Sequence, residues 1–270
     1  MKELEFPEGV LPLDFLTSSI EKNRYSEEIK GIPGLIDYGF DYKSRSDCSM
    51  TFFLSHSHGD FDYQLMVGEL NELLDSEPFF YITRNTLPSR MLKITVDSAY
   101  EPERLEGGNF ANLEVSVNVS GLPFWRTKYT TQEIESSGYS GLVEKYGTAD
   151  GLHVDYLKYT FTGTTFKVWN GGNVTVDPRN MDLKIRLYRL VTDGGFTMTN
   201  KTTGEVFKYT APRTGNTVDL NGVKALVGLA SNRLRETNRK FISLVPGENE
   251  ITISGGTVDN IQFDFPFYYK

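Results

Sequence analysis

The chain has 270 residues, a hydrophobic fraction of 39% and a formal net charge of −8. These values are typical of a folded protein with a substantial core rather than a disordered chain. No apolar run approaches the roughly 20 residues that cross a bilayer, and the acidic N-terminus lacks the apolar segment of a signal peptide. The negative charge argues against broad binding to nucleic acid backbones. We expect a protein assembled inside a cell, without membrane insertion or sequence-specific nucleic acid binding.

Cys48 is the single cysteine of the chain. One cysteine excludes an internal disulfide framework and a thiolate metal cluster. We expect Cys48 to be a small residue at the start of a strand, not a nucleophile, because no Cys–His pairing is suggested nearby.

The first clear elements are a strand followed by a helix. In MTFFLS, Met50, Phe52 and Leu54 alternate on one face of a strand. The next segment, DYQLMVGELNELLDS, predicts a helix over about 62–75, with Gly59 in the connecting turn and Asp60 or Asp62 as the helix N-cap. The residues expected to form one stripe of this helix are Leu65, Met66, Glu69, Leu70, Leu73 and Leu74.

The connection itself reads HSHGDFD. The spacing of His56, His58 and Asp60 resembles the first half of the dinuclear zinc motif of metallo-β-lactamase-like hydrolases. That motif continues with a further histidine, where this chain has Phe61, and the one remaining histidine is His153. Because each ion of such a site takes about four ligands, the segment is better explained as a strand-to-helix joint.

No residue of the sequence can be assigned a catalytic role. A glycosidase needs a carboxylate pair at a defined separation, and no spacing among the 36 Asp and Glu residues singles out such a pair. We therefore predict a protein that is not an enzyme. We assign no catalytic, cofactor-binding or metal-binding residue and expect no cofactor.

Further alternations of period two predict strands in LKITV, LEVSVNV, LKIRLYRL and IQFDFPFYY, and Pro266 limits where the last strand pairs. Half-buried strands separated by Gly, Asn and Asp turns indicate antiparallel sheets and sandwiches. The residues expected on the buried faces are Leu92, Ile94, Val96, Leu113, Val115, Val117, Val119, Leu183, Ile185, Leu187, Ile261, Phe263, Phe265, Phe267 and Tyr269.

Two segments are less regular. Residues 127–160 are polar and lack clean periodicity, which indicates a linker or long excursion between two β-rich halves. VKALVGLASNRLRE has apolar spacing that a helix also fits, but Gly222, Gly228 and the strand-like KFISL that follows favour strand and loop.

Several stretches, in this order, resemble the distal tail proteins of long-tailed phages that infect Gram-positive bacteria. The first half resembles the family in IPGLIDYGFDYKSR, MTFFLS, LMVGELNELLDSEPFFYI, MLKITV and LEVSVNV closing on GLPFW. The second half resembles it in FKVWNGGNVTVDP, FTMTNKTTGEVF and FISLVPGENEITISGG. The resemblance covers about residues 30–125 and 165–270, and its specificity lies in the order and spacing of these stretches.

The resemblance implies a mainly β fold: an N-terminal ring-forming β-sandwich with one packed helix (1–126), the linker or excursion (127–160) and a C-terminal galectin-like β-sandwich (161–270). It also implies a structural virion protein. Members form a hexameric ring at the distal end of the tail, around the DNA exit channel. The ring joins the tail tube protein to the tail-tip hub, and peripheral domains carry receptor-binding proteins. The location implied is the phage tail tip, after assembly in the host cytoplasm.

The alternative is a carbohydrate-binding module that recognises host cell-wall polysaccharide. Trp125, Tyr156, Tyr159 and Trp169 could supply flat platforms for sugar rings. Core packing explains such aromatic residues better, and a binding site further requires polar groups that converge on an exposed ring.

Overall fold

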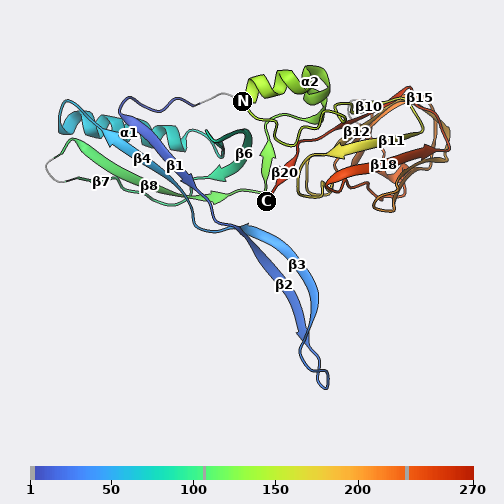
Figure 1. Cartoon of the computed structure of the whole chain (residues 1–270), viewed down its shortest axis with the longest axis horizontal. Helices are drawn as coiled ribbons and strands as arrows, with labels where there is room; N and C mark the ends of the chain where they lie inside the picture. Colours follow the sequence, from blue (N-terminus) through green and yellow to red (C-terminus); the bar gives the residue numbers. More distant parts are fainter. Residues whose placement is uncertain (1–3, 106–107, 229–230) are drawn as a thin grey trace. The chain divides into compact units, whose positions relative to one another are not determined.

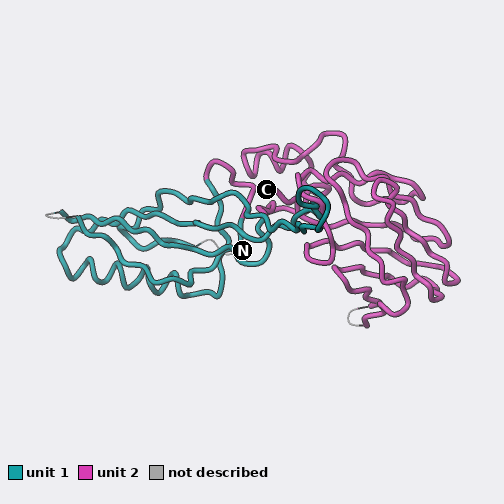
Figure 2. Tube along the Cα trace, turned by 90° about the horizontal axis from the view of Figure 1, so that it is seen from below, with its two compact units in different colours: residues 1–84, 92–123 teal, residues 85–91, 124–270 magenta. Residues whose placement is uncertain are grey.

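The computed structural model describes residues 4–105, 108–228 and 231–270. The chain forms two compact units, shown in Figure 2: unit 1 holds residues 1–84 and 92–123, and unit 2 holds residues 85–91 and 124–270. Strands account for 48% and helices for 13% of the chain, which confirms the mainly β fold class. In the described ranges, no helix combines the length and the apolar character needed to cross a membrane.

Unit 1 is built on antiparallel strands. β1 (Val10–Leu16), β4 (Cys48–Ser55) and β8 (Phe110–Val119) pair in that order. The end of β6 (Leu87–Thr95) pairs with β8, and a tight turn joins β6 to the preceding strand β5 (Phe80–Arg84). β7 (Glu103–Arg104) pairs with the start of β8. The alternation predicted for β4, β6 and β8 is confirmed for these side chains, which are buried: Met50, Phe52, Leu54, Leu92, Ile94, Leu113, Val115 and Val117. Val96 and Val119, predicted on the same faces, are only half-buried.

The predicted helix is present as α1 (Asp60–Asp75), which lies along this sheet (Figure 1). Its buried stripe consists of Tyr63, Met66, Leu70 and Leu74. The prediction that Leu65 and Glu69 belong to this stripe was wrong, because both are exposed. Residues 63, 66, 70 and 74 follow the helical repeat of three or four residues, and position 65 falls outside it.

The predicted N-cap was also wrong. Gly59 is the N-cap residue of α1, with φ of 90°, and no side chain caps the helix there. Gly59 therefore supplies the turn, as expected, in a left-handed conformation that a glycine adopts without strain. The carboxylate of Asp62 instead accepts hydrogen bonds from the backbone N–H groups of Ser57 and His58, at 3.1 and 3.4 Å, and so ties the connecting loop to the first helical turn.

Between β1 and β4 the chain forms a separate antiparallel hairpin, which we call the arm. It consists of β2 (Ile20–Glu28), β3 (Leu35–Arg45) and the loop between them. Figure 1 shows the arm leaving the β1 and β4 strands of unit 1 as a long ribbon. This hairpin was not predicted from the sequence.

Unit 2 is a β-sandwich of two antiparallel sheets. The six-stranded sheet has the order β10 (Thr160–Phe161), β19 (Asn260–Asp264), β12 (Lys184–Asp193), β15 (Pro212–Asn221), β16 (Lys224–Val227), β17 (Ser231–Asn232). The four-stranded sheet has the order β11 (Thr165–Asn170), β18 (Gly247–Ser254), β13 (Phe196–Asn200), β14 (Glu205–Tyr209). Side chains of both sheets line one apolar interior: Ile185 and Leu220 from the first, Met198 and Phe207 from the second.

The segment after Gly222 forms β16, β17 and the short 3₁₀ helix η1 (Leu234–Glu236), which confirms strand and loop rather than a long helix; Leu229 and Ala230 lie outside the described residues. Residues 127–160, expected to be a linker or long excursion, contain the helix α2 (Thr131–Tyr146). Gly138, with φ of 69°, interrupts it.

The C-terminal alternation is confirmed over β19, where Ile261 and Phe263 are buried and their neighbours are half-buried. Beyond it the alternation fails, because every residue from Phe265 to Tyr269 is buried, and Pro266 limits the pairing as predicted. β19 ends at Asp264, and the short β20 (Tyr268–Tyr269) pairs with β9 (Trp125–Thr127), whose other partner is the first part of β6. Between these strands, the hydroxyl oxygens of Thr131 and Thr127 accept the backbone N–H groups of Phe265 and Phe267, at 3.2 and 3.0 Å. The backbone donors beside the proline are thus satisfied by side chains instead of a strand.

Candidate assembly surface

The histidines of the metal-like motif have different environments. His56 is 4% exposed, and its ring packs against Tyr63 with centroids 5.2 Å apart. Neither ring nitrogen of His56 has a hydrogen-bond partner among the described residues. His58 is exposed, with Nδ1 3.9 Å from the carboxylate of Asp62, and His153 belongs to unit 2. In the part of the chain that the structure describes, no three His, Cys, Asp or Glu side chains are grouped to hold a metal ion.

The other singled-out residues divide into buried and surface positions. Cys48 is buried at the first position of β4, as expected. Trp125 and Tyr159 are buried and cannot serve as platforms for a ligand. Trp169 and Tyr156 are only partly buried, and their rings stack at 5.0 Å with an interplanar angle of 14°.

The arm is held together by contacts within itself. After Ile20, every residue of β2 is exposed. Ion pairs cross the two strands, from Arg24 to Asp37 at 3.2 Å and from Lys43 to Glu21 at 3.0 Å. Both faces of the hairpin therefore face solvent. An isolated two-stranded hairpin is at best marginally stable in water, so a partner surface is expected for an arm of this length.

The tip of the arm is apolar although it is exposed. Ile32 is 50% exposed and Leu35 is 66% exposed, with Ile29 and Tyr38 beside them also exposed. Exposed apolar groups gathered at one place mark sites of interaction. The loop between the strands contains two glycines at positive φ, which permits the tight reversal at the tip.

The root of the arm is fixed by one buried arginine. Arg45, the last residue of β3, donates from Nε to the carbonyl oxygen of Pro123 at 2.8 Å and from Nη1 to that of Ser18 at 2.6 Å. Burial lowers the pKa of Arg45 from its ordinary value, and the two carbonyl oxygens compensate part of the cost of burying the charge. The arm thus has an anchored base in unit 1 and an apolar tip.

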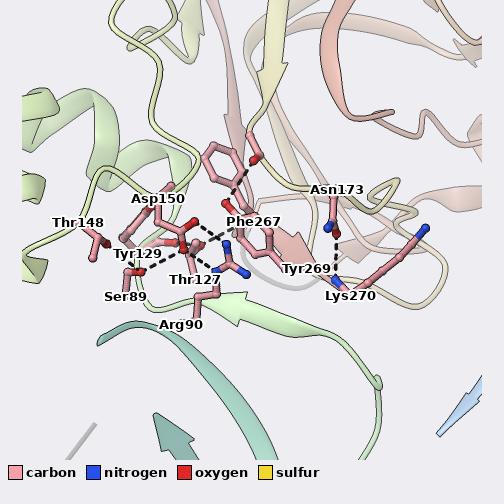
Figure 3. A network of polar contacts seen from close by, with 11 residues as sticks. Ser89, Arg90, Thr127, Tyr129, Thr148, Asp150, Asn173, Phe267, Tyr269 and Lys270 are labelled. Atoms are coloured by element: carbon pink, nitrogen blue, oxygen red, sulfur yellow. Dashed lines mark hydrogen bonds and ion pairs between the residues drawn. The ribbon is translucent and has the colours of Figure 1, made fainter. Parts of the chain in front are cut away.

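In unit 2, a polar network surrounds the last residues of the chain (Figure 3). Arg90 donates from Nε and Nη2 to the two carboxylate oxygens of Asp150, at 2.5 and 2.6 Å, and Ser89 Oγ donates to the same carboxylate at 3.1 Å. The guanidinium of Arg90 also lies 3.4 Å from the ring centroid of Tyr269. Tyr129 donates its hydroxyl to the backbone oxygen of Asp150.

Burial and charge in this network shift the pKa values of Arg90 and Tyr269. Burial alone would lower the pKa of Arg90, but the hydrogen bonds and charge of Asp150 outweigh it and raise the pKa. Burial raises the pKa of Tyr269 above its ordinary value. The network therefore holds an ion pair that fastens β6, the loop after α2 and β20 within unit 2. No sequence signal connects Arg90 with Asp150, which are 60 positions apart.

The chain thus combines a mainly β fold with a β-sandwich in unit 2 and an exposed arm in unit 1. Among solved structures, it is similar to the crystal structure of the SPP1 Dit protein (gp 19.1), described as a paradigm of the hub adsorption apparatus in phages infecting Gram-positive bacteria. The TM-score is 0.65 at 14% identity, over 96% of this chain and 94% of that one.

Two structures of the phage p2 baseplate in its activated conformation, with Sr and with Ca, match with TM-scores of 0.42 and 0.39, each at 11% identity. They cover 96% and 95% of this chain and 90% of each matched chain. No protein-family model and no curated protein matches the sequence. The predicted resemblance to distal tail proteins is thus confirmed as a likeness of fold.

Proposed function

We propose that this chain is a structural component of a phage tail tip, and that copies of it join head-to-tail through the arm into a closed hexameric ring. The observation that carries the proposal is the exposed arm with its apolar tip. A closed ring requires a heterologous interface, in which two different patches of the same chain meet. An arm that is anchored at its root and apolar at its tip supplies one of these patches.

The remaining assignments rest on the likeness of fold. Residues 1–126 would form the ring, and the sandwich of 161–270 would lie outside it. The ring would join the tail tube to the tail-tip hub, carry or contact receptor-binding proteins and surround the DNA exit channel. In the host cytoplasm the chain would be made and assembled into the virion. Part of the net charge of −8 would line the bore and repel DNA phosphates.

The first test is the mass of the purified protein by light scattering, followed by negative-stain imaging. We expect particles of about six times the 30.6 kDa of one chain, with a central hole. A double variant, Ile32→Asp with Leu35→Asp, is expected to abolish them, because it puts two charges into an interface that buries apolar groups.

The matched control is Val223→Asp, which puts a charge at an exposed apolar residue in a turn of unit 2. This variant is expected to keep the ring. The proposal would be wrong if the wild-type chain remained monomeric both alone and with its tail tube and hub neighbours. It would also be wrong if the arm-tip variant formed rings as readily as wild type.

A further inference from the structure

The outer face of the four-stranded sheet in unit 2 combines an aromatic pair with polar side chains. Along β11, Phe166 and Val168 point into the sandwich, so Lys167 and Trp169 lie on the outer face. β18 and β13 continue this face across the sheet. Their outward side chains are Glu248, Glu250 and Thr252 from β18, and Thr197 and Thr199 from β13.

Trp169 leaves apolar ring surface at this face although its polar group is satisfied. The indole Nε1 donates to the carbonyl oxygen of Gly151 at 3.3 Å. Tyr156 stacks on the indole with nearly parallel rings, and His153 approaches both rings, with centroids 5.0 Å from each. Because all three side chains are only partly buried, the cluster presents aromatic surface to solvent beside β11.

Hydrogen-bonding groups converge on the same place. Glu248 lies opposite Trp169 in the strand pairing. Its carboxylate accepts the hydroxyl of Tyr156 at 2.5 Å and pairs with Lys167 at 2.7 Å. Next to this pair, Lys201 and Glu250 are 2.8 Å apart. Lys167 and Lys201 therefore balance the charges of Glu248 and Glu250 on this part of the face.

From this arrangement we infer that the face is a binding site for a neutral glycan. A sugar ring offers C–H groups that pack on aromatic surface and hydroxyls that both donate and accept hydrogen bonds. The carboxylate and ammonium groups beside the aromatic cluster match that chemistry. The paired charges disfavour a polyanionic ligand, and the outer positions of β11, β18 and β13 carry no large aliphatic side chain of the kind that forms the centre of protein interfaces.

Within this site, Tyr156 and Trp169 would contact the sugar ring, and Glu248 and Lys167 would bind its hydroxyls. Of the four aromatic residues predicted as possible sugar platforms, only Tyr156 and Trp169 can contact a ligand, because Trp125 and Tyr159 are buried. The inference concerns the outer face of one sheet in a single chain. It does not depend on formation of the ring.

The test is a titration of the full chain with cellohexaose, maltohexaose and chitohexaose, followed by tryptophan fluorescence and by saturation-transfer NMR. We expect saturable binding of at least one oligosaccharide. Tyr156→Ala should weaken it about tenfold, because an aromatic contact is lost, and Glu248→Gln should weaken it several-fold. Lys208→Ala, at an exposed position of β14 in the same sheet, should bind as wild type does.

Tyr156→Phe keeps the ring stack and removes the hydroxyl, so it should retain more affinity than Tyr156→Ala even if the alanine variant loosens the loop. The inference is overturned if none of the three oligosaccharides binds, or if binding survives both Tyr156→Ala and Glu248→Gln unchanged. It is also overturned if a poly(glycerol phosphate) polymer binds while the neutral sugars do not. Ring formation measured on the same variants separates this outcome from failure of the proposed function.

Discussion

Replacing Asp150 by Asn should destabilise unit 2 by about 3 kcal/mol. The carboxylate and the guanidinium that it pairs with are mostly buried, with 10% and 21% of their side chains exposed. Breaking such a pair leaves a charge without its partner, at a cost of roughly 3–5 kcal/mol. The lower end applies because an Asn oxygen still accepts one hydrogen bond from Arg90. The equilibrium constant for unfolding should rise about 100-fold, since each 1.4 kcal/mol is a factor of ten.

The measurement is urea unfolding followed by tryptophan fluorescence. Both tryptophans of the chain, Trp125 and Trp169, belong to unit 2, so this signal reports on that unit. The control is Asp182→Asn. Its carboxylate lies 2.6 Å from Arg126 but is 68% exposed, so the loss should stay below about 1 kcal/mol. If Asp150→Asn unfolded within 0.5 kcal/mol of wild type, a magnitude typical of exposed pairs, the reasoning about burial would be refuted.

Three further changes have definite expected outcomes. His56→Phe should stabilise unit 1 by about 1 kcal/mol in thermal unfolding, because two buried nitrogens without partners are removed; a loss of stability would indicate a hidden partner. Burial raises the pKa values of Tyr129, Tyr159 and Tyr269 in the folded chain. Unit 2 should therefore keep its full stability below about pH 10, the ordinary tyrosine pKa, and lose stability at higher pH, where only the unfolded chain ionises these hydroxyls. The tyrosinate absorbance of the three residues should appear only as unit 2 unfolds. Gly171→Ala should cost about 3 kcal/mol in the same fluorescence assay, since the added carbon would lie 2.0 Å from a backbone oxygen; wild-type stability would contradict that packing.

The strands were predictable because one of their faces is buried. In β8, Leu113, Val115 and Val117 are buried while the residues between them are exposed, and this contrast is written directly into the sequence as a period of two. α1 was also predictable because one of its faces is buried, with a repeat of three or four residues instead of two. Its N-cap was not, because Asp60 and Asp62 both lie within three residues of Gly59, and only the backbone conformation decides which residue begins the helix.

α2 escaped prediction because few of its residues meet the core. Only Thr131, Ile134 and Leu142 are buried, and Gly138 interrupts the helix with a positive φ. Three positions spread over 16 residues do not produce a recognisable stripe. The polar composition of this segment is therefore a poor guide to whether it is ordered, and its order comes from contacts such as Thr131 with the C-terminal strand segment.

The arm shows a more general limit of prediction from sequence periodicity. Periodicity records burial within one chain, and the arm buries almost nothing in its own chain: β2 is exposed from Glu21 onward. Its most exposed aliphatic residues lie at the tip, where Ile32 belongs to the loop and Leu35 is the first residue of β3. A segment that buries little in its own chain therefore shows no burial repeat in its sequence. Residues that stabilise a unit, such as Asp150, are thus separate from the arm-tip residues proposed to assemble it, and stability and assembly can be changed independently.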